Sequence, residues 1–370
     1  MRFPYDVPVL TDGVITLRAH TEADVELLYE TTLDADSLRW TAIPLDNTRA
    51  DSRHFATEIM RIGWEEKDHH GWAIEAIDDD GIAKFAGNID VRGMPIADVG
   101  FVLHPWARGR GIMKRALELA SNWAFAEGGV EIIHWRAQVG NEASLRVAWA
   151  AGFNLTGTLP GFLYERERVL DVWAGFIRFG DKPGPKSVWR ESTVIEDGDL
   201  RLRPYRLDDA PRIVEACTDE RSRLWLAALP MPYTEASARE FINNNTWNAA
   251  TGNKVSWVVA DRDSDLMLAN ISIFGMDGLD QLSGEVGYWT HPEARGRGVM
   301  TEATRLVIGH AFGPMGMRRL SLMAATANTA SNQVALANDF RLVGTETRAD
   351  PIGDGTFADM NVYELFPSYP

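Results

Sequence analysis

The chain has 370 residues, 45% of them hydrophobic and 24% charged, which predicts two or three globular domains with ample core. Its formal net charge of −16 argues against nucleic-acid and membrane partners, since both are polyanions. A single cysteine, Cys217, excludes an internal disulfide and a cysteine-based zinc site, and we expect no metal. Neither a basic-apolar leader nor a bilayer-length apolar run of roughly 18–20 residues is present, so we expect a cytoplasmic protein.

The first half of the chain alternates strand-like and helix-like patterns. A helix is expected after the first strand, and a second helix follows the Gly-rich loop at 108–111, where apolar residues recur at helical spacing. A short third helix ends at Gly152 and Phe153. The strands predicted in this half cover 15–18, 72–77, 85–91, 99–103, 131–137 and 169–179.

The second half repeats this order of elements. Its predicted strands cover 200–203, 257–260, 268–274, 286–290, 319–324 and 359–366. Prolines and a glycine among charges at 181–186 are typical of a linker. We therefore predict an α+β fold of two tandem domains, residues 1–180 and 193–370, joined by a linker at 181–192. A period this long indicates two globular copies and excludes a solenoid.

The most distinctive repeated stretch is an Arg-Gly-Arg-Gly loop at 108–111 and again at 295–298. A Gly-rich loop that opens a helix directs several backbone N–H groups at one point, where the helix dipole is positive, and so favours phosphate. A Walker loop would end in Gly-Lys-Ser/Thr, and a Rossmann loop would need a third glycine where Lys114 and Thr301 stand. Both better-known phosphate loops are therefore excluded.

The two loops resemble the pyrophosphate loop of the GCN5-related N-acetyltransferases (GNAT), whose motif runs Arg/Gln-x-x-Gly-x-Gly/Ala. Met113 and Met300 depart from the small residue that is usual after it. With Val-Gly-aromatic before the loop and Asn-x-x-Ser after it, both halves are similar to the RimJ/RimL-type branch of that family. The resemblance implies a mixed sheet splayed at its centre, with acetyl-CoA in the splay and pantetheine along the strand before the loop.

The resemblance assigns cofactor contacts in both halves to the strand before the loop, the loop itself and the asparagine of Asn-x-x-Ser. In the first half these residues are Phe101, Val102, Leu103, Arg108, Gly109, Arg110, Gly111, Ile112, Met113 and Asn141. In the second half they are Tyr288, Trp289, Thr290, Arg295, Gly296, Arg297, Gly298, Val299, Met300 and Asn328. We expect the arginines to add charge at the phosphates, and a strand N–H near Val102 or Trp289 to stabilise the carbonyl oxygen.

Two pairs of residues are candidates for proton transfer. Asp98 and Glu285 stand two residues before the Gly of Val-Gly-aromatic, where the family often has its base, with a solvated edge carboxylate as the alternative for each. Many relatives have a tyrosine acid four residues after the Ser of Asn-x-x-Ser, but alanines stand there in both halves. Ser144 and Ser331 are therefore the acid candidates, with capping of the next helix as the alternative.

These features predict an acyl-CoA-dependent N-acetyltransferase that moves acetyl from acetyl-CoA to a primary amine of a small molecule. Attack is expected to be direct, because the chain has no catalytic cysteine and no Gly-x-Ser-x-Gly elbow. Two alternatives are open: a protein N-terminal acetyltransferase, and a catalytically silent acyl-CoA sensor or scaffold. We expect both halves to bind acyl-CoA, with the second favoured for chemistry and loops near Trp40 and Trp225 walling the acceptor site. A homodimer is possible.

Overall fold

The computed structural model describes residues 2–367, so Met1 and 368–370 of the predicted domain ranges lie outside it. The chain divides into two compact units, Met1–Lys186 and Ser187–Pro370, which we call unit 1 and unit 2. The division falls inside the segment predicted as the linker. The Ser187 hydroxyl donates to the carbonyl oxygen of Ala250 in unit 2, whereas the backbone of Gly184 lies against Gly152 of unit 1. These contacts assign the two ends of the segment to different units.

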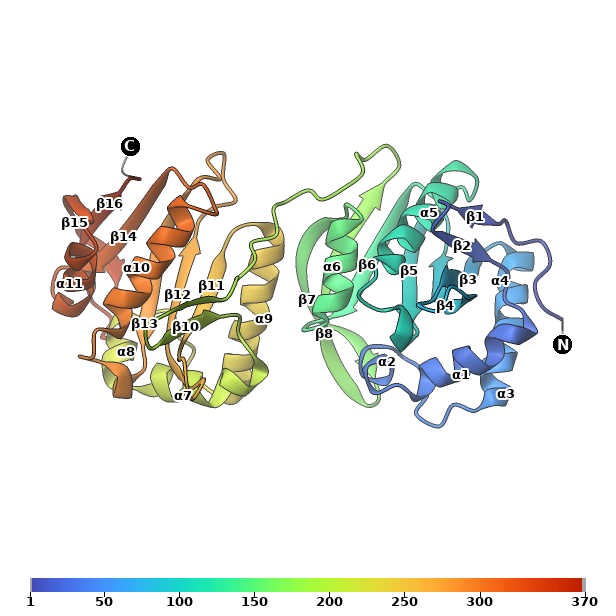
Figure 1. Cartoon of the computed structure of the whole chain (residues 1–370), viewed down its shortest axis with the longest axis horizontal. Helices are drawn as coiled ribbons and strands as arrows, with labels where there is room; N and C mark the ends of the chain where they lie inside the picture. The colour runs from blue at the N-terminus through green and yellow to red at the C-terminus, as the bar shows by residue number, and fades with distance from the viewer. Residues whose placement is uncertain (1, 368–370) are drawn as a thin grey trace. The chain divides into compact units, whose positions relative to one another are not determined.

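Unit 1 is built on an eight-stranded sheet with helices on both faces (Figure 1). The strand order is β1-β2-β3-β4-β5-β6-β8-β7. The strands are β1 (Leu10–Thr11), β2 (Ile15–Arg18), β3 (His69–Ile77), β4 (Ala83–Arg92), β5 (Ile96–Leu103), β6 (Ile132–Gln138), β7 (Asn154–Glu165) and β8 (Arg168–Arg178). The helices are α1 (Val25–Leu33), α2 (Ala35–Trp40), α3 (Arg49–His54), α4 (Met60–Glu66), α5 (Ile112–Ala126) and α6 (Glu142–Ala150).

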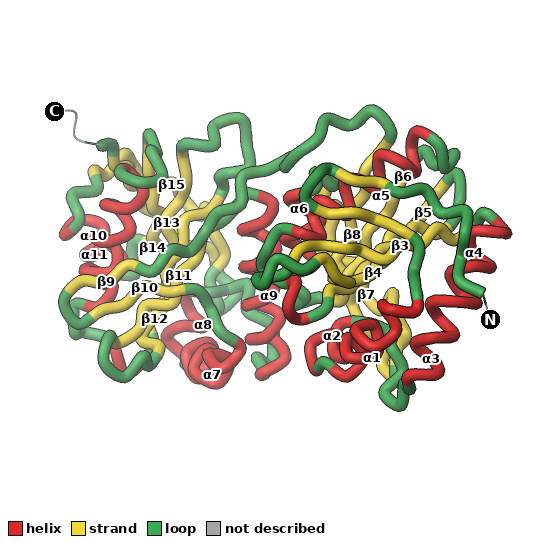
Figure 2. The backbone as a smooth tube through the Cα atoms, turned by 45° about the vertical axis from the view of Figure 1, so that its right-hand side comes forward, coloured by secondary structure: helices red, strands yellow, loops and turns green. Residues whose placement is uncertain are grey.

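Unit 2 repeats the arrangement, with strand order β15-β16-β14-β13-β12-β11-β10-β9. Its strands are β9 (Ile195–Asp197), β10 (Leu200–Arg203), β11 (Val255–Asp261), β12 (Met267–Phe274), β13 (Ser283–Thr290), β14 (Arg319–Ala325), β15 (Arg341–Pro351) and β16 (Phe357–Leu365). Its helices are α7 (Ala210–Thr218), α8 (Glu220–Trp225), α9 (Glu235–Thr251), α10 (Val299–Phe312) and α11 (Thr329–Ala337). The tube view separates the strands of each sheet from the helices that cover them (Figure 2).

Each sheet is splayed at its centre, as the resemblance predicts. β5 runs parallel to β6 but pairs with it only from Ile96 to Asp98, although β5 stays paired with β4 as far as Leu103. In unit 2, β13 pairs with β14 only from Ser283 to Glu285. Within the described residues the two parallel strands then diverge, so one edge of β5 and of β13 is free to bond another chain.

The two faces of each sheet have separate cores. In unit 2, α10 and α11 pack with Val286, Leu322 and their neighbours, whereas α7 and α9 pack on the opposite face with Val258 and Ala260. α10 forms because its apolar residues recur at helical spacing, and those on the inner side are buried. Since side chains alternate along a strand, Glu285 lies on the α7–α9 face and Tyr288 on the α10–α11 face.

The strands β7 and β15 were not among the predicted elements. Both are long, antiparallel to β8 and β16, and interrupted by register shifts. Their side chains are mostly exposed, so neither strand shows the clear alternation that marks a half-buried strand. Among residues 2–367, no helix is long and apolar enough to cross a membrane.

Candidate functional site

The two Gly-rich loops have the geometry of anion-binding turns. Gly109 and Gly111 have φ of 73° and 72°, and Gly296 and Gly298 have 70° and 75°. An added Cβ at these positions meets no atom within 4 Å, so the positive φ is what requires glycine. Gly111 and Gly298 are the N-caps of α5 and α10, and no side chain caps these helix ends. The first N–H groups of each helix are therefore left for a ligand.

The first arginine of each loop is held by the protein itself. Arg108 Nη2 donates to the carboxylate of Asp34 and to Ser37 Oγ at 2.9 Å, both at the start of α2. Arg295 makes the same pair of bonds to Asp219 and to Ser222 Oγ, 2.8 Å away at the start of α8. We call this repeated contact the arginine strap. The two guanidinium groups that we expect to add charge at the phosphates thus also join the loop to α2 or α8.

The second arginine differs between the units. Arg110 Nη2 donates to the carbonyl oxygen of Ile77 at 3.0 Å, and its guanidinium lies 5.3 Å from the Trp106 ring centroid. Arg297 makes no hydrogen bond or ion pair within the described part of the chain. Ile112 and Val299 are largely buried in the core, so little of their side chains is exposed to a ligand.

A cavity opens in the splay of each unit. In unit 1 it measures about 850 Å³. The predicted residues that line it are Asp98, Phe101, Val102, Leu103, Arg108, Met113, Asn141 and Ser144. In unit 2 it measures about 380 Å³. The predicted residues that line it are Tyr288, Trp289, Thr290, Arg295, Gly296, Gly298, Val299, Met300, Asn328 and Ser331. Gly109, Arg110, Gly111 and Ile112 of unit 1, and Arg297 and Glu285 of unit 2, are outside these linings.

The free edge of each central strand presents backbone donors to this cavity. The N–H of His104 bonds Ala86 in the β4 direction, and that of His291 bonds Leu268 on the β12 side. Because the hydrogen-bonding direction alternates along an antiparallel strand, the N–H groups of Phe101 and Tyr288 point away from β4 and β12, into the splay. Phe101 and Tyr288 are therefore candidates for the donor expected near Val102 or Trp289.

Asparagine, and not serine, caps the helix that follows β6 or β14. Asn141 Oδ1 accepts the N–H of Ser144 at 3.1 Å, and Asn328 Oδ1 accepts that of Ser331 at 3.4 Å. The alternative that the two serines are caps is therefore wrong, and both hydroxyls are free for other bonds.

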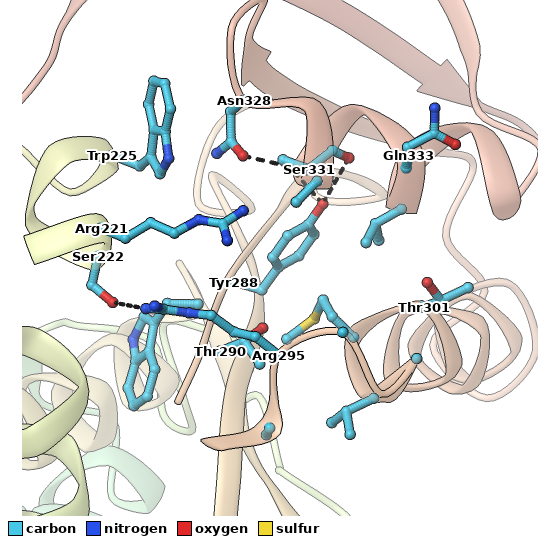
Figure 3. A pocket seen from close by; sticks show the side chains of 18 of the residues that line it. Arg221, Ser222, Trp225, Tyr288, Thr290, Arg295, Thr301, Asn328, Ser331 and Gln333 are labelled. Atoms are coloured by element: carbon cyan, nitrogen blue, oxygen red, sulfur yellow. Dashed lines mark hydrogen bonds between the residues drawn. The ribbon is translucent and has the colours of Figure 1, made fainter. Parts of the chain in front are cut away.

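The serine hydroxyls meet different partners in the two units. Ser144 Oγ accepts the indole N–H of the buried Trp135 at 3.0 Å. Ser331 Oγ lies 3.0 Å from the hydroxyl of Tyr288, and Figure 3 shows the two together beside Asn328. Burial raises the pKa of Tyr288 to about 12, so its hydroxyl stays protonated at neutral pH. β13 therefore places a tyrosine hydroxyl beside Ser331.

The two candidate bases have opposite surroundings. Asp98 Oδ1 forms an ion pair with Arg136 Nη2 at 2.7 Å. Glu285 is half-buried and forms no ion pair or hydrogen bond through its side chain among residues 2–367. Burial, with a contribution from the Asp350 carboxylate, raises the pKa of Glu285. Such a carboxylate is a stronger base than an exposed, ion-paired one.

The strand register explains this difference. His134 pairs with Asp98, and Arg136 lies two residues further on the same face of β6. Ser321 pairs with Glu285, and the residue two further along β14 is Met323. Across the other edge, Arg92 opposes Asp98, whereas Phe274 opposes Glu285. The positions held by Arg136 and Arg92 in unit 1 are therefore held by the apolar residues Met323 and Phe274 in unit 2.

Some residues at the two cavities were missed by the sequence reasoning. Asp90, Arg92, Arg136 and Phe162 of β7 line the cavity of unit 1, together with Trp40, which was expected to wall the acceptor site. In unit 2, Arg221 lines the cavity and extends between Trp225 and Tyr288 (Figure 3). Aligning the halves strand by strand would have shown the exchange of Arg136 for Met323, whereas the Arg92–Phe274 match requires the register.

The family model of the acetyltransferase (GNAT) domain matches residues 15–154 and 199–341. The chain belongs to this family. It is an acetyl-CoA-dependent N-acetyltransferase by this membership and by its named relatives. Among curated proteins, the ribosomal-protein-serine acetyltransferase of Escherichia coli (strain K12) is 27% identical over 130 residues, 35% of this chain and 70% of that protein. The putative ribosomal N-acetyltransferase YdaF of Bacillus subtilis (strain 168) is 30% identical over 138 residues, 36% of this chain and 74% of that protein.

Solved structures give matches to single domains of this GNAT chain. The ribosomal-protein-S5-alanine acetyltransferase of Vibrio fischeri has a TM-score of 0.43 and 18% identity, covering 47% of this chain and 96% of that one. No group of three or more His, Cys, Asp or Glu residues suited to a metal ion occurs in the part of the chain that the structure describes.

Proposed function

We propose that unit 2 transfers the acetyl group of acetyl-CoA directly to a primary amine, with Glu285 as the general base. The observation that carries the proposal is the unpaired, half-buried Glu285 carboxylate, whose pKa is raised at the point where β13 and β14 separate. A lysine-like amine with a pKa of ~10.4 is protonated at neutral pH, so a base must take its proton before attack. Glu285 accepts it directly or through one water.

The bond changes in this transfer are balanced without a covalent enzyme intermediate. The amine nitrogen bonds the acyl carbon and the carbon–sulfur bond breaks. Of the two protons that the ammonium nitrogen loses, one passes to Glu285 before attack and the other passes to solvent, which protonates the departing thiolate. The N–H of Tyr288 faces the splay, where negative charge would build on the carbonyl oxygen. We propose that the Tyr288 hydroxyl, 3.0 Å from Ser331 Oγ, donates a hydrogen bond to the departing sulfur.

Tyr288 is better suited to hydrogen bonding than to full proton transfer. With its pKa at about 12, giving its proton to a thiolate of pKa ~8.5 would be uphill by roughly 5 kcal/mol. A hydrogen bond from the hydroxyl stabilises the thiolate without that transfer, and solvent then supplies the proton. Ser331 positions the hydroxyl for this bond.

Both units are proposed to bind acyl-CoA. In each, a positive-φ glycine leaves the first N–H groups of α5 or α10 uncapped, and a free strand edge lies beside the loop. The uncapped N–H groups suit the diphosphate of CoA, and the free strand edge suits its amide chain.

The acceptor is proposed to be a small-molecule amine. A protein N-terminus is the second candidate, favoured by the names of the relatives, which include a ribosomal-protein-serine acetyltransferase. Thiol release from acetyl-CoA, followed with a library of free amines and a library of short peptides, separates the two. Turnover on peptides alone would replace the first acceptor class by the second. Binding of acetyl-CoA with no turnover on either library would leave the silent-sensor alternative.

A further inference from the structure

Four charged side chains form two neighbouring ion pairs at one end of the unit 1 cavity. Arg92 Nε bonds Asp90 Oδ2 at 2.9 Å, and Arg136 Nη2 bonds Asp98 Oδ1 at 2.7 Å. All four line the same cavity of about 850 Å³. The register places Arg92 opposite Asp98, so the pairs lie side by side on the sheet. We call Asp90, Arg92, Asp98 and Arg136 the charge quartet.

Gly100 makes room for this arrangement. A Cβ at Gly100 would lie 2.7 Å from Arg92 Nη2 and 2.8 Å from Asp90 Oδ1. The Asp90–Arg92 pair therefore lies directly over the strand, where any side chain at this position would displace it. Gly100 has no positive φ, so this contact, and not the backbone conformation, is what requires glycine.

The charge quartet leaves many hydrogen-bonding positions unused. A guanidinium has five N–H donors and a carboxylate about four acceptor sites, more than the Asp90–Arg92 and Asp98–Arg136 ion pairs occupy. His69 Nε2, 3.0 Å from Asp90, is the one further ion-pair neighbour among the described residues. The side chains of Arg92 and Arg136 are 52% and 36% exposed, and ion pairs this exposed add little to stability.

Unit 2 has no such set of charges. Its residues at the four positions are Ser272, Phe274, Glu285 and Met323. The two units thus share the cofactor loop and differ at the acceptor end. Aromatic side chains add to the difference, since Phe162 lies 4.8 Å from the Arg136 guanidinium, and Trp40 and Phe55 line the same cavity.

We propose that the charge quartet binds a free α-amino acid with an apolar or aromatic side chain in the cavity of unit 1. The amino acid's carboxylate bonds the unused N–H groups of Arg92 and Arg136, and its ammonium bonds Asp90 and Asp98. The quartet carries no net charge, so a zwitterion keeps the site neutral and uses both donors and acceptors. A simple amine would leave the guanidinium donors without a partner. This binding site goes beyond the transfer proposed for unit 2.

The test is calorimetric titration of the full chain saturated with CoA, which prevents turnover. The probes are phenylalanine, leucine and methionine, each compared with its amide and with its decarboxylated amine. We expect one amino-acid site per chain and at least tenfold weaker binding of the amide and the amine. Equal binding of amino acid and amide would overturn the proposal in favour of a peptide N-terminus, and absence of amino-acid binding would overturn it outright.

Replacing Arg136 by methionine, the residue at the equivalent position of unit 2, tests the role of this arginine. Arg136→Met is expected to weaken amino-acid binding at least tenfold while leaving binding of the decarboxylated amine unchanged. Arg341→Met, an exposed arginine paired with Glu364 in unit 2, is the matched control and is expected to bind like the parent. If Arg136→Met does not fold, Arg92→Phe replaces it. Unchanged amino-acid affinity in a folded variant overturns the proposal.

Because binding is measured without reaction, failure here is distinguishable from failure of the transferase. Turnover on amides with no binding of amino acids would remove the zwitterion site and keep the transferase. Binding of amino acids without turnover on any amine would keep the site and remove the transfer step.

Discussion

Asp98 in unit 1 and Glu285 in unit 2 stand at the same point of the same strand, yet they have opposite neighbours. Arg136 forms an ion pair with Asp98, whereas Met323 and Phe274 stand at the matching positions beside Glu285, whose pKa is raised by burial and by the Asp350 carboxylate. The same strand position thus holds one carboxylate in an ion pair and the other without one. The comparison teaches that the residues across the two strand edges, more than the carboxylate itself, decide its chemistry.

The same exchange occurs around the serine of each unit. Trp135 of β6 reaches Ser144, and Tyr288 of β13 reaches Ser331, so the partner moves from one side of the splay to the other. Only the tyrosine carries a hydroxyl that is able to bond a departing sulfur. We therefore expect the acid-side chemistry, like the base, to belong to unit 2.

The largest expected effect is that of removing the free base. Glu285→Gln should lower turnover about 10²-fold, because the amide cannot accept the proton of the ammonium. Steady-state thiol release from acetyl-CoA measures it. Glu196→Gln, at the β9–β10 edge, removes an exposed carboxylate that is paired with Arg201 and should keep full activity. Unchanged turnover in Glu285→Gln would move the chemistry to unit 1 and reverse the comparison.

Next in size is the loss of a loop glycine. Gly298→Ala places a Cβ at φ 75°, which costs about 1–2 kcal/mol, and should weaken acetyl-CoA binding roughly tenfold in unit 2 alone. Calorimetry should show two sites in the parent chain, with one weakened in Gly298→Ala and the other in Gly111→Ala. Gly198→Ala, at φ 53° in the β9–β10 turn, carries similar strain without the site and should bind normally. A single site in the parent chain would show that the two loops are not equivalent.

A smaller effect is expected from the tyrosine hydroxyl. Tyr288→Phe gives unit 2 the residue of unit 1 and removes one hydrogen bond to the departing sulfur, so kcat should fall about five- to tenfold with KM little changed. Tyr233→Phe removes another buried hydroxyl and serves as the control for packing. A rise in KM at constant kcat would instead place Tyr288 in ground-state binding.

The smallest effect concerns pH and stability. Met323→Arg should lower the pKa of Glu285 and shift the acid limb of kcat/KM to lower pH, as an arginine does for a neighbouring carboxylate. Since folding raises the pKa of Glu285, its stabilising contribution is present at low pH and is lost as pH rises through the folded value. Unfolding midpoints from pH 4 to 8 should therefore fall more in the parent chain than in Glu285→Gln. Parallel curves would mean that Glu285 titrates as an exposed group.

Much of the fold followed from the sequence, because the repeat supplied each pattern twice. The α+β class, the splayed sheet and the central strands were confirmed, since their buried faces impose apolar patterns. β7 and β15 were missed because their side chains are largely exposed. At the site, the loop glycines have the expected geometry, but the bonds of Arg108 and Arg295 depend on α2 and α8, which are distant in sequence. Long-range side-chain partners of this kind leave no periodic signal.

The arginine strap has a consequence for the order of events. Ser37 and Ser222 stand on the short helices that carry Trp40 and Trp225, so each strap joins the phosphate loop to a wall of the cavity. A loop that tightens on one substrate pulls the wall that receives the other. We therefore expect ordered sequential kinetics, in which the thioester binds first and its binding shapes the acceptor site.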